Sequence, residues 1–262
     1  MNRLAVLPLL LAAAVALAEP PPPPAVRNVE IDERLGAPVP EGLPFVDAAG
    51  RAVRLGDYFR PGRPVILTLV YDRCPMLCSL LLRDLARGLR ELAWRPGKDF
   101  EVVTVSVDPA EKPALAAQKQ GGYLQALGDP GDAAAWPFLT GPPSSTAALA
   151  RALGFRYSYD PITKSWAHGA LLFLLSPAGK ISRYLYGVDF PASTLRLALS
   201  EAGARKVVAS IDRILLTCYH YDPASRRYGL AIFAALRAGG LLVLGLLGIL
   251  IGRLAIRERR RG

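Results

Sequence analysis

Cysteine and histidine are scarce in this sequence. Its 262 residues contain 3 cysteines and 2 histidines. A scaffold held together by disulfides normally uses more cysteines, in even number, so that class of protein is excluded. A histidine ligand of a metal must likewise be His168 or His220. The chemistry of the chain therefore depends on very few side chains.

Clustered positive charge is also absent, although the formal net charge is +10. Half of this excess belongs to the two ends of the chain, to Arg3 and to the stretch 253–262. The rest is spread out, and no basic stripe is interleaved with aromatic residues. We therefore expect no nucleic-acid partner. Internal repeats are absent too, and the one low-complexity tract is the proline run 20–24.

Two long apolar stretches lie at the ends of the chain, which is 52% hydrophobic. The first follows Arg3 and ends in Ala16-Leu17-Ala18, which is typical of a secretory signal peptide. The second is long enough to cross a membrane, and the arginine-rich end behind it favours a cytoplasmic C-terminus.

These stretches predict a protein with its folded domain on the periplasmic or extracytoplasmic side of a bacterial-type cell membrane. A single C-terminal pass would anchor it. The expected parts are a signal peptide (1–18), a proline-rich linker (19–27), a folded domain (28–205), a membrane-proximal segment (206–227), a transmembrane helix (228–256) and a cytoplasmic basic tail (257–262).

The folded domain alternates strand and helix patterns. The apolar runs 65–70 and 100–107 predict buried strands, and the leucines between them recur at helical spacing. A right-handed crossover through that helix would set the two strands parallel. Further along, we expect a third buried strand at 167–175 and a long helix at 193–216. This alternation predicts an α/β fold with a mixed central sheet.

Two cysteines lie where the first buried strand passes into the helix. Cys74 and Cys78 flank Pro75, which suits the first position of a helix. Peptide dipoles at a helix N-terminus favour thiolate over thiol, and the thiolate is both the nucleophile and the metal ligand. Two thiolates at this spacing suit a soft metal such as Cu(I) or Zn. They equally suit a disulfide or two buried thiols.

A third ligand is expected, because two thiolates alone leave bound copper open to other thiols. His168 follows Trp166-Ala167 at the start of a buried strand, and in an α/β layer it can face the cysteine loop. Together with Cys74 and Cys78 it would give a site of two sulfurs and one nitrogen. The alternative is that His168 is an ordinary polar residue at a strand start.

Several segments together resemble the SCO/SenC family of copper-delivery proteins. The stretch 71–78 is similar to the family's aromatic-x-x-Cys-Pro-x-x-Cys element. The stretch 105–109 is similar to its strand ending in Asp-Pro, and 136–141 to its Trp-x-x-Leu-Thr-Gly segment. His168 falls where the family places its histidine ligand. The resemblance covers about residues 26–203.

This resemblance implies a thioredoxin-like fold and copper as the bound metal, with Cys74, Cys78 and His168 as ligands. It implies that Asp108 tunes the site from outside the ligand set. It further implies a metallochaperone rather than an enzyme, whose partner is the copper-bearing subunit of cytochrome c oxidase. Other periplasmic copper chaperones or thiol reductants are further expected partners.

The chain departs from many members of the family in three ways. It has Ser79 where many carry Pro and Ser176 where many carry Asp, and neither residue is an expected ligand. Its expected membrane anchor is C-terminal, whereas members are often anchored at the N-terminus.

A membrane-tethered thiol–disulfide oxidoreductase that keeps oxidase cysteines reduced is the alternative function. It needs Cys74 and Cys78 as a redox-active pair but no histidine. Thioredoxin-type enzymes use C-x-x-C, one residue fewer than here, which disfavours this alternative. A thiol peroxidase is disfavoured because Tyr71 stands where peroxiredoxins place Thr or Ser.

Cys218 and His220 form a further Cys-x-His pair just outside the expected membrane span. They can make a low-coordinate copper site, or they are a lone thiol and an interfacial histidine among tyrosines. Met76 is similarly either a soft thioether beside the two sulfurs or a packing residue of the loop.

Overall fold

The computed structural model contains two compact units, which divide after Val208. It describes residues 29–74, 77–128, 132–161, 163–208, 220–222, 227–229, 240, 241, 243 and 245. The expected signal peptide, linker and basic tail lie outside these residues, as does most of the expected transmembrane segment. Within the described residues, no helix has both the length and the apolar character that a membrane crossing needs.

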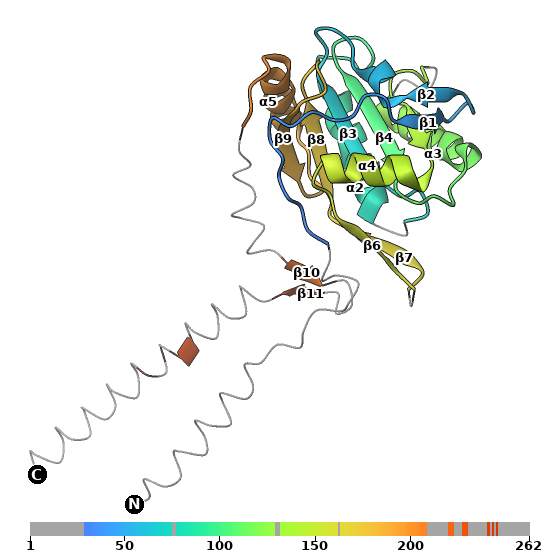
Figure 1. Ribbon diagram of the computed structural model, residues 1–262. Helices are drawn as coiled ribbons and strands as arrows, with labels where there is room; N and C mark the ends of the chain where they lie inside the picture. The colour runs from blue at the N-terminus through green and yellow to red at the C-terminus, as the bar shows by residue number, and fades with distance from the viewer. Residues whose placement is uncertain are drawn as a thin grey trace, which may run out of the picture. The chain divides into compact units, whose positions relative to one another are not determined.

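A seven-stranded mixed sheet forms the centre of the first unit (Figure 1). Its strand order is β2-β1-β5-β4-β3-β8-β9. β4 pairs parallel with both β3 and β5, and the other neighbouring pairs are antiparallel. The strands are β1 (Pro44–Asp47), β2 (Ala52–Arg54), β3 (Val65–Val70), β4 (Glu101–Ser106), β5 (Phe138–Thr140), β8 (Leu171–Leu175) and β9 (Ile181–Tyr186).

The strands β3 and β4 are buried along their whole length. They run parallel, from Val65 opposite Glu101 to Val70 opposite Ser106. Parallel strands are covered on both faces, which explains why their sequences are continuously apolar rather than alternating. The two predicted buried strands and their parallel arrangement are therefore confirmed.

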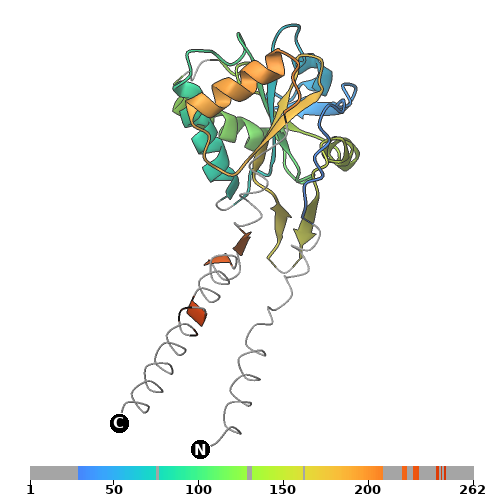
Figure 2. The ribbon, with the colours of Figure 1, turned by 90° about the vertical axis from the view of Figure 1, so that its left-hand side faces the viewer.

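Helices cover both faces of the sheet. α2 contacts α3 and α5 on one face, and α4 lies on the opposite face (Figure 2). α2 follows β3 and leads to β4, so it is the predicted crossover. The helices are η2 (Leu55–Tyr58), α2 (Leu77–Arg90), α3 (Pro113–Leu127), α4 (Pro143–Ala152) and α5 (Ala192–Gly203).

The helix α2 buries the face that carries Cys78. Leu81 and Leu85, on the predicted apolar face, are fully buried with it. Gly88 allows a close approach on the same side, because a Cβ there would lie 2.1 Å from the carbonyl oxygen of Phe190. Burial along this face and the close contact near the end of α2 fix the helix against the rest of the unit.

The predicted continuous strand at 167–175 is wrong, because the chain leaves the sheet in its middle. Residues Ser165–His168 form β7, which pairs antiparallel with β6 (Tyr157–Asp160) in a separate two-stranded sheet. After Gly169-Ala170 the chain enters β8, which pairs with β3 and β9. The β6–β7 hairpin extends beyond the sheet in both views (Figures 1 and 2).

The predicted helix 193–216 is also too long, since α5 ends at Gly203. Arg205 adopts a left-handed conformation with φ of 56°. The N–H of Lys206 donates to the carbonyl of Glu201 at 2.9 Å, and that of Arg205 to Ala202 at 3.0 Å. This pair of bonds is a Schellman motif, which ends a helix. Residues 209–216 lie outside the described part of the chain.

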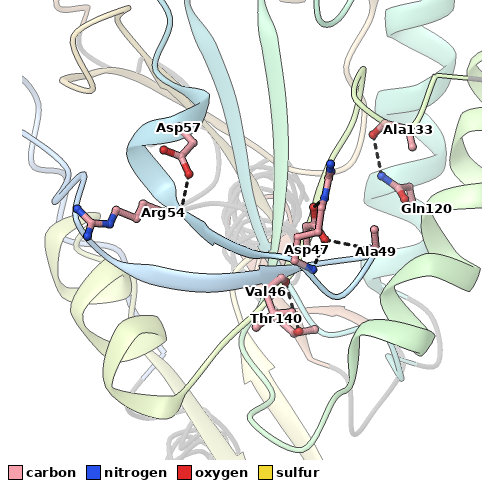
Figure 3. Close-up of polar contacts among 9 residues, drawn as sticks. Val46, Asp47, Ala49, Arg54, Asp57, Gln120, Ala133 and Thr140 are labelled. Atoms are coloured by element: carbon pink, nitrogen blue, oxygen red, sulfur yellow. Dashed lines mark hydrogen bonds and ion pairs between the residues drawn. The ribbon is translucent and has the colours of Figure 1, made fainter.

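The strands β1 and β2 form an antiparallel hairpin that turns around residues 47–50. Asp47 holds its turn, since one carboxylate oxygen accepts from the N–H groups of Ala49 at 3.0 Å and Arg51 at 2.9 Å (Figure 3). Gly50 follows with φ of 81°, a conformation that glycine adopts without a steric penalty.

The second unit contains a two-stranded antiparallel sheet among its described residues. β10 (His220–Asp222) pairs with β11 (Arg227–Gly229). The described residues 240, 241, 243 and 245 are helical. Cys218 lies outside the described residues.

Candidate metal centre

The two predicted cysteines lie at the carboxyl end of β3. The chain leaves the strand through a turn in which the N–H of Cys74 donates to the carbonyl of Tyr71 at 3.1 Å. The N–H of Cys78, in the first turn of α2, donates to the sulfur of Cys74 at 3.3 Å. Cys74 is half-buried, whereas Cys78 is only 3% exposed. Within the described part of the chain, Cys74 and Cys78 are not joined in a disulfide.

His168 lies against the cysteine pair, although it is far away in the sequence. Its Nε2 is 3.2 Å from the sulfur of Cys78. Its Nδ1 is 2.9 Å from the carbonyl oxygen of Gly169. A carbonyl oxygen only accepts, so Nδ1 carries the proton in the neutral ring and Nε2 has the free lone pair. The nitrogen that faces the sulfur is therefore the one able to bind a metal.

Aromatic rings enclose the imidazole. Tyr71 meets it edge to face, with ring centroids 5.7 Å apart and planes at 81°. Phe155 lies on another side at 5.9 Å. The Tyr71 hydroxyl also hydrogen-bonds to the Cys74 side chain and to the main chain of Trp166, and burial raises the pKa of this phenol. Tyr71 thus contacts the cysteine turn, the histidine and β7 at once.

Burial disfavours charge on two of the three expected ligands, His168 and Cys78, in the metal-free protein. The pKa of His168 is lowered, mainly because burial disfavours the charged ring. The pKa of the Cys78 thiol is raised, first by its hydrogen bond with Cys74 and then by burial. The expectation that helix dipoles favour the thiolate is therefore wrong for Cys78, because desolvation and the neighbouring sulfur outweigh the dipoles.

Two buried carboxylates lie behind the cysteine turn. Glu111 accepts hydrogen bonds from the N–H groups of Asp72 and Arg73, both at 2.8 Å. Burial and the nearby Glu111 raise the pKa of Asp72 to about 7, and its Oδ1 has no hydrogen-bond partner among the described residues. The charge of Glu111 therefore adds to burial in disfavouring ionisation of Asp72.

Asp108, which was expected to tune the site, uses its side chain in a local turn. Its carboxylate accepts from the N–H of Ala110 at 2.9 Å. The acid of this segment that contacts the cysteine turn is Glu111, which the sequence reasoning missed. The available signal was its place three residues after an Asp that ends a buried strand.

The structure brings the side chains of Cys78 and His168 into contact, and the sulfur of Cys74 accepts a hydrogen bond from the N–H of Cys78. Even so, no three Cys, His, Asp or Glu side chains among the described residues are arranged to hold a metal ion as they stand. Met76 lies outside the described residues, and only the main-chain pairing of His220 is described.

A mixed sheet with two thiols between a central strand and the next helix defines a protein of the thioredoxin-like class. More specifically, the chain belongs to the SCO1/SenC family, whose model matches residues 34–199. That span agrees with the resemblance found in the sequence. No curated protein matches the chain.

Solved structures share this fold. A putative electron transfer protein from Aquifex aeolicus is 26% identical, with a TM-score of 0.58 over 66% of this chain and 95% of that chain. BsSco, described as a member of the Sco family of cytochrome c oxidase assembly proteins, is 22% identical, with a TM-score of 0.50 over 68% and 99%. Arabidopsis thaliana ScoI, solved with copper bound, is 20% identical, with a TM-score of 0.49 over 65% and 99%.

Proposed function

We propose that this protein is a copper metallochaperone that holds copper through Cys74, Cys78 and His168. The observation that carries the proposal is the 3.2 Å contact between the sulfur of Cys78 and Nε2 of His168. Two residues so far apart in sequence meet here with the lone pair of the ring facing the thiol. Membership of the SCO1/SenC family supports the choice of copper as cargo.

The chemistry of the three donors fits copper. Thiolate sulfur is a soft ligand that prefers Cu(I), and imidazole suits both oxidation states of copper. Loading would replace the Cys78–His168 hydrogen bond with bonds to the ion and would release the thiol protons. Copper affinity should therefore rise with pH. Cys74, the more exposed sulfur, is the side chain that an incoming or outgoing copper carrier would meet first.

The proposed acceptor is the binuclear copper centre of a haem–copper oxidase, to which copper is delivered during assembly. The likeness to BsSco, which is described as a member of the Sco family of cytochrome c oxidase assembly proteins, supports this partner. Other extracytoplasmic copper chaperones or thiol reductants are proposed as further partners, because the site must be loaded and kept reduced.

We place the domain on the extracytoplasmic side of a membrane, with a C-terminal anchor and a cytoplasmic tail. The arginines between Arg253 and Arg261 support this orientation. A reporter that is active only outside the cytoplasm, fused after Gly262, should be silent. Strong activity from that fusion would reverse the orientation.

Thiol–disulfide exchange is the second candidate function. The difference in exposure between Cys74 and Cys78 favours it, because an accessible thiol above a buried one suits attack followed by resolution. A disulfide between them would leave no thiolate for copper, so the two functions compete for the same sulfurs.

Copper binding by the full chain tests the site. Cys74→Ser, Cys78→Ser and His168→Ala should each weaken copper binding in competition with a chelator, by at least about tenfold. The comparison variant is His220→Ala, which removes the second histidine of the chain. Unchanged affinity there assigns the copper to the His168 site, whereas a loss would assign it to the Cys218–His220 pair. If His168→Ala bound copper with the stoichiometry and affinity of the wild type, His168 would not be a ligand. Only Cys74 and Cys78 would then remain as the proposed ligands.

A cell-based assay separates delivery from reduction. If delivery is the role, added copper should restore oxidase activity to cells without the protein, and His168→Ala should fail at limiting copper. If thiol exchange is the role, a small reductant should restore activity instead, and His168→Ala should function normally.

A further inference from the structure

The carboxylate of Glu111 lies beneath the turn that presents Cys74. Its Oε2 accepts from the N–H of Asp72, and its Oε1 accepts from the N–H of Arg73, each at 2.8 Å. The two donors are consecutive main-chain groups, so both oxygens of one carboxylate bind one short segment. The side chain of Glu111 is almost fully enclosed, and the residue is 4% exposed.

The carboxylate is itself fixed from the end of β4. The hydroxyl of Ser106, the last residue of that strand, donates to Oε2 of Glu111 at 2.6 Å. The same hydroxyl oxygen accepts from the N–H of Asp108 at 3.1 Å. The parallel pairing of β3 with β4 sets Val70 opposite Ser106. The position of the cysteine turn is thus tied to the neighbouring strand through one carboxylate.

The position needs a group that accepts two hydrogen bonds at once, because the N–H groups of Asp72 and Arg73 both point at it. An amide of the same shape would satisfy one N–H and direct its own NH₂ group at the other, leaving a buried donor without an acceptor. A carboxylate accepts from both at once, and such charge-assisted bonds are strong.

We propose that Glu111 is a positioning residue for the metal site, which orients the turn 72–74 and hence the sulfur of Cys74. For copper, this rests on the proposed function. The effect on the thiol itself does not, because the carboxylate contacts the main chain whether or not a metal is bound.

The test compares Glu111→Gln with Asp47→Asn in the full-length protein. Asp47 is a close match, because it is also 4% exposed and accepts from two nearby main-chain N–H groups. It holds the β1–β2 turn rather than the cysteine turn (Figure 3). Three quantities are measured: copper affinity by chelator competition, the alkylation rate of Cys74 in metal-free protein, and the free energy of unfolding.

In Glu111→Gln, copper affinity should fall about 10- to 100-fold, the usual effect of losing a partner that orients a ligand. The alkylation rate of Cys74 should change by more than about threefold, since the Cys74 sulfur no longer has a fixed environment. Asp47→Asn should lose a similar amount of unfolding free energy and keep both site properties within about twofold of wild type.

Site properties within twofold of wild type in Glu111→Gln would overturn the proposal. So would equal losses of affinity in Asp47→Asn, because the effect would then follow from stability alone. Should Glu111→Gln not fold, Ser106→Ala removes the hydroxyl that fixes the carboxylate and should shift both site properties in the same direction. Wild-type behaviour of Ser106→Ala would then count against the proposal.

Failure of the proposed function gives a different result. A wild-type chain that binds no copper would refute the chaperone, while the alkylation rates would still decide the role of Glu111.

Discussion

The candidate site joins two regions that are built very differently. Its sulfurs come from the rim of the seven-stranded sheet, next to β3, in which every residue is buried. Its imidazole comes from β7, in a two-stranded sheet in which every residue of that strand is half-buried. One half of the site therefore belongs to the core, and the other half belongs to an extension of it.

The difference shows how each half is held in place. Burial of apolar side chains on both faces fixes β3, whereas the β6–β7 hairpin relies on a few aromatic contacts. Trp166 packs against Tyr157 and Tyr159, with ring centroids 5.4 and 5.1 Å apart. A lone two-stranded hairpin is marginally stable. We therefore expect the histidine side to adjust when the site is loaded, while the sulfur side stays fixed.

The largest effect should come from breaking the core half. Leu67→Ala, at the centre of β3 with no exposed surface, should lower the free energy of unfolding by about 2–5 kcal/mol. Tyr159→Ala in the hairpin, where the side chain is 49% exposed, should change it by less than about 0.5 kcal/mol. Urea unfolding of both variants checks this. Equal losses would show that hairpin and sheet are equally important to stability.

An intermediate effect should come from Asp72, a buried acid beside the cysteine turn whose Oδ1 has no hydrogen-bond partner in the described part of the chain. Asp72 has its pKa raised to about 7 by burial and by Glu111. Between its ordinary pKa of 3.8 and about 7, the Asp72 carboxyl is ionised in the unfolded chain but mostly protonated in the folded protein. The free energy of unfolding therefore falls as pH rises from 3.8 towards 7. Asp72→Asn should therefore stabilise the protein at pH 8, by up to about 4 kcal/mol if the whole shift is recovered. The gain should vanish near pH 4.

The control for this prediction is Asp189→Asn, at a side chain that is 80% exposed. Its unfolding free energy should stay within about 0.5 kcal/mol of wild type. An Asp72→Asn variant that is less stable than wild type at pH 8 would mean that the carboxylate contributes to folding in its charged form.

The smallest effect should come from protonating the histidine side. Burial lowers the pKa of His168 below its ordinary value of 6.5. As pH falls below 6.5, His168 becomes protonated in the unfolded chain but stays neutral in the folded protein. The free energy of unfolding, which is highest above pH 6.5, therefore falls. Asp72 titrates in the same range with the opposite sign, so the comparison is made in an Asp72→Asn background. There, His168→Gln should lose less stability than its parent between pH 8 and 5.5.

His220→Gln in the same background is the matched control and should keep the pH dependence of the parent. If His168→Gln also kept the pH dependence of the parent, the imidazole of His168 would titrate normally. The ring would then not be buried by the hairpin in solution.

Much of the fold could be predicted because burial leaves a local pattern. The runs 65–70 and 100–107 are apolar throughout, and parallel buried strands are what such runs form. The two errors have local causes that are visible only in the folded chain. Gly169 marks where the chain passes from hairpin to sheet, and Arg205 ends α5 in a conformation that glycine usually adopts.

The site was less predictable than the fold. The places of Cys74 and Cys78 follow from sequence, because a strand runs directly into a helix there. The ionisation of Cys78 does not, because it depends on how deeply the sulfur is buried and on its neighbours. Glu111 had no motif of its own, and its role depends on main-chain groups 38 and 39 residues away.

By itself, then, the sequence determined the two central strands β3 and β4, the crossover helix, the cysteine pair and the family to which the chain belongs. These depend on periodicity and on residues adjacent in the chain. Only the tertiary structure decided that His168 meets Cys78 with its Nε2, that β7 leaves the sheet, and that Glu111 supports the turn. Each of these depends on atoms that are distant in sequence and meet only when the sheet and hairpin pack, so no local pattern encodes them.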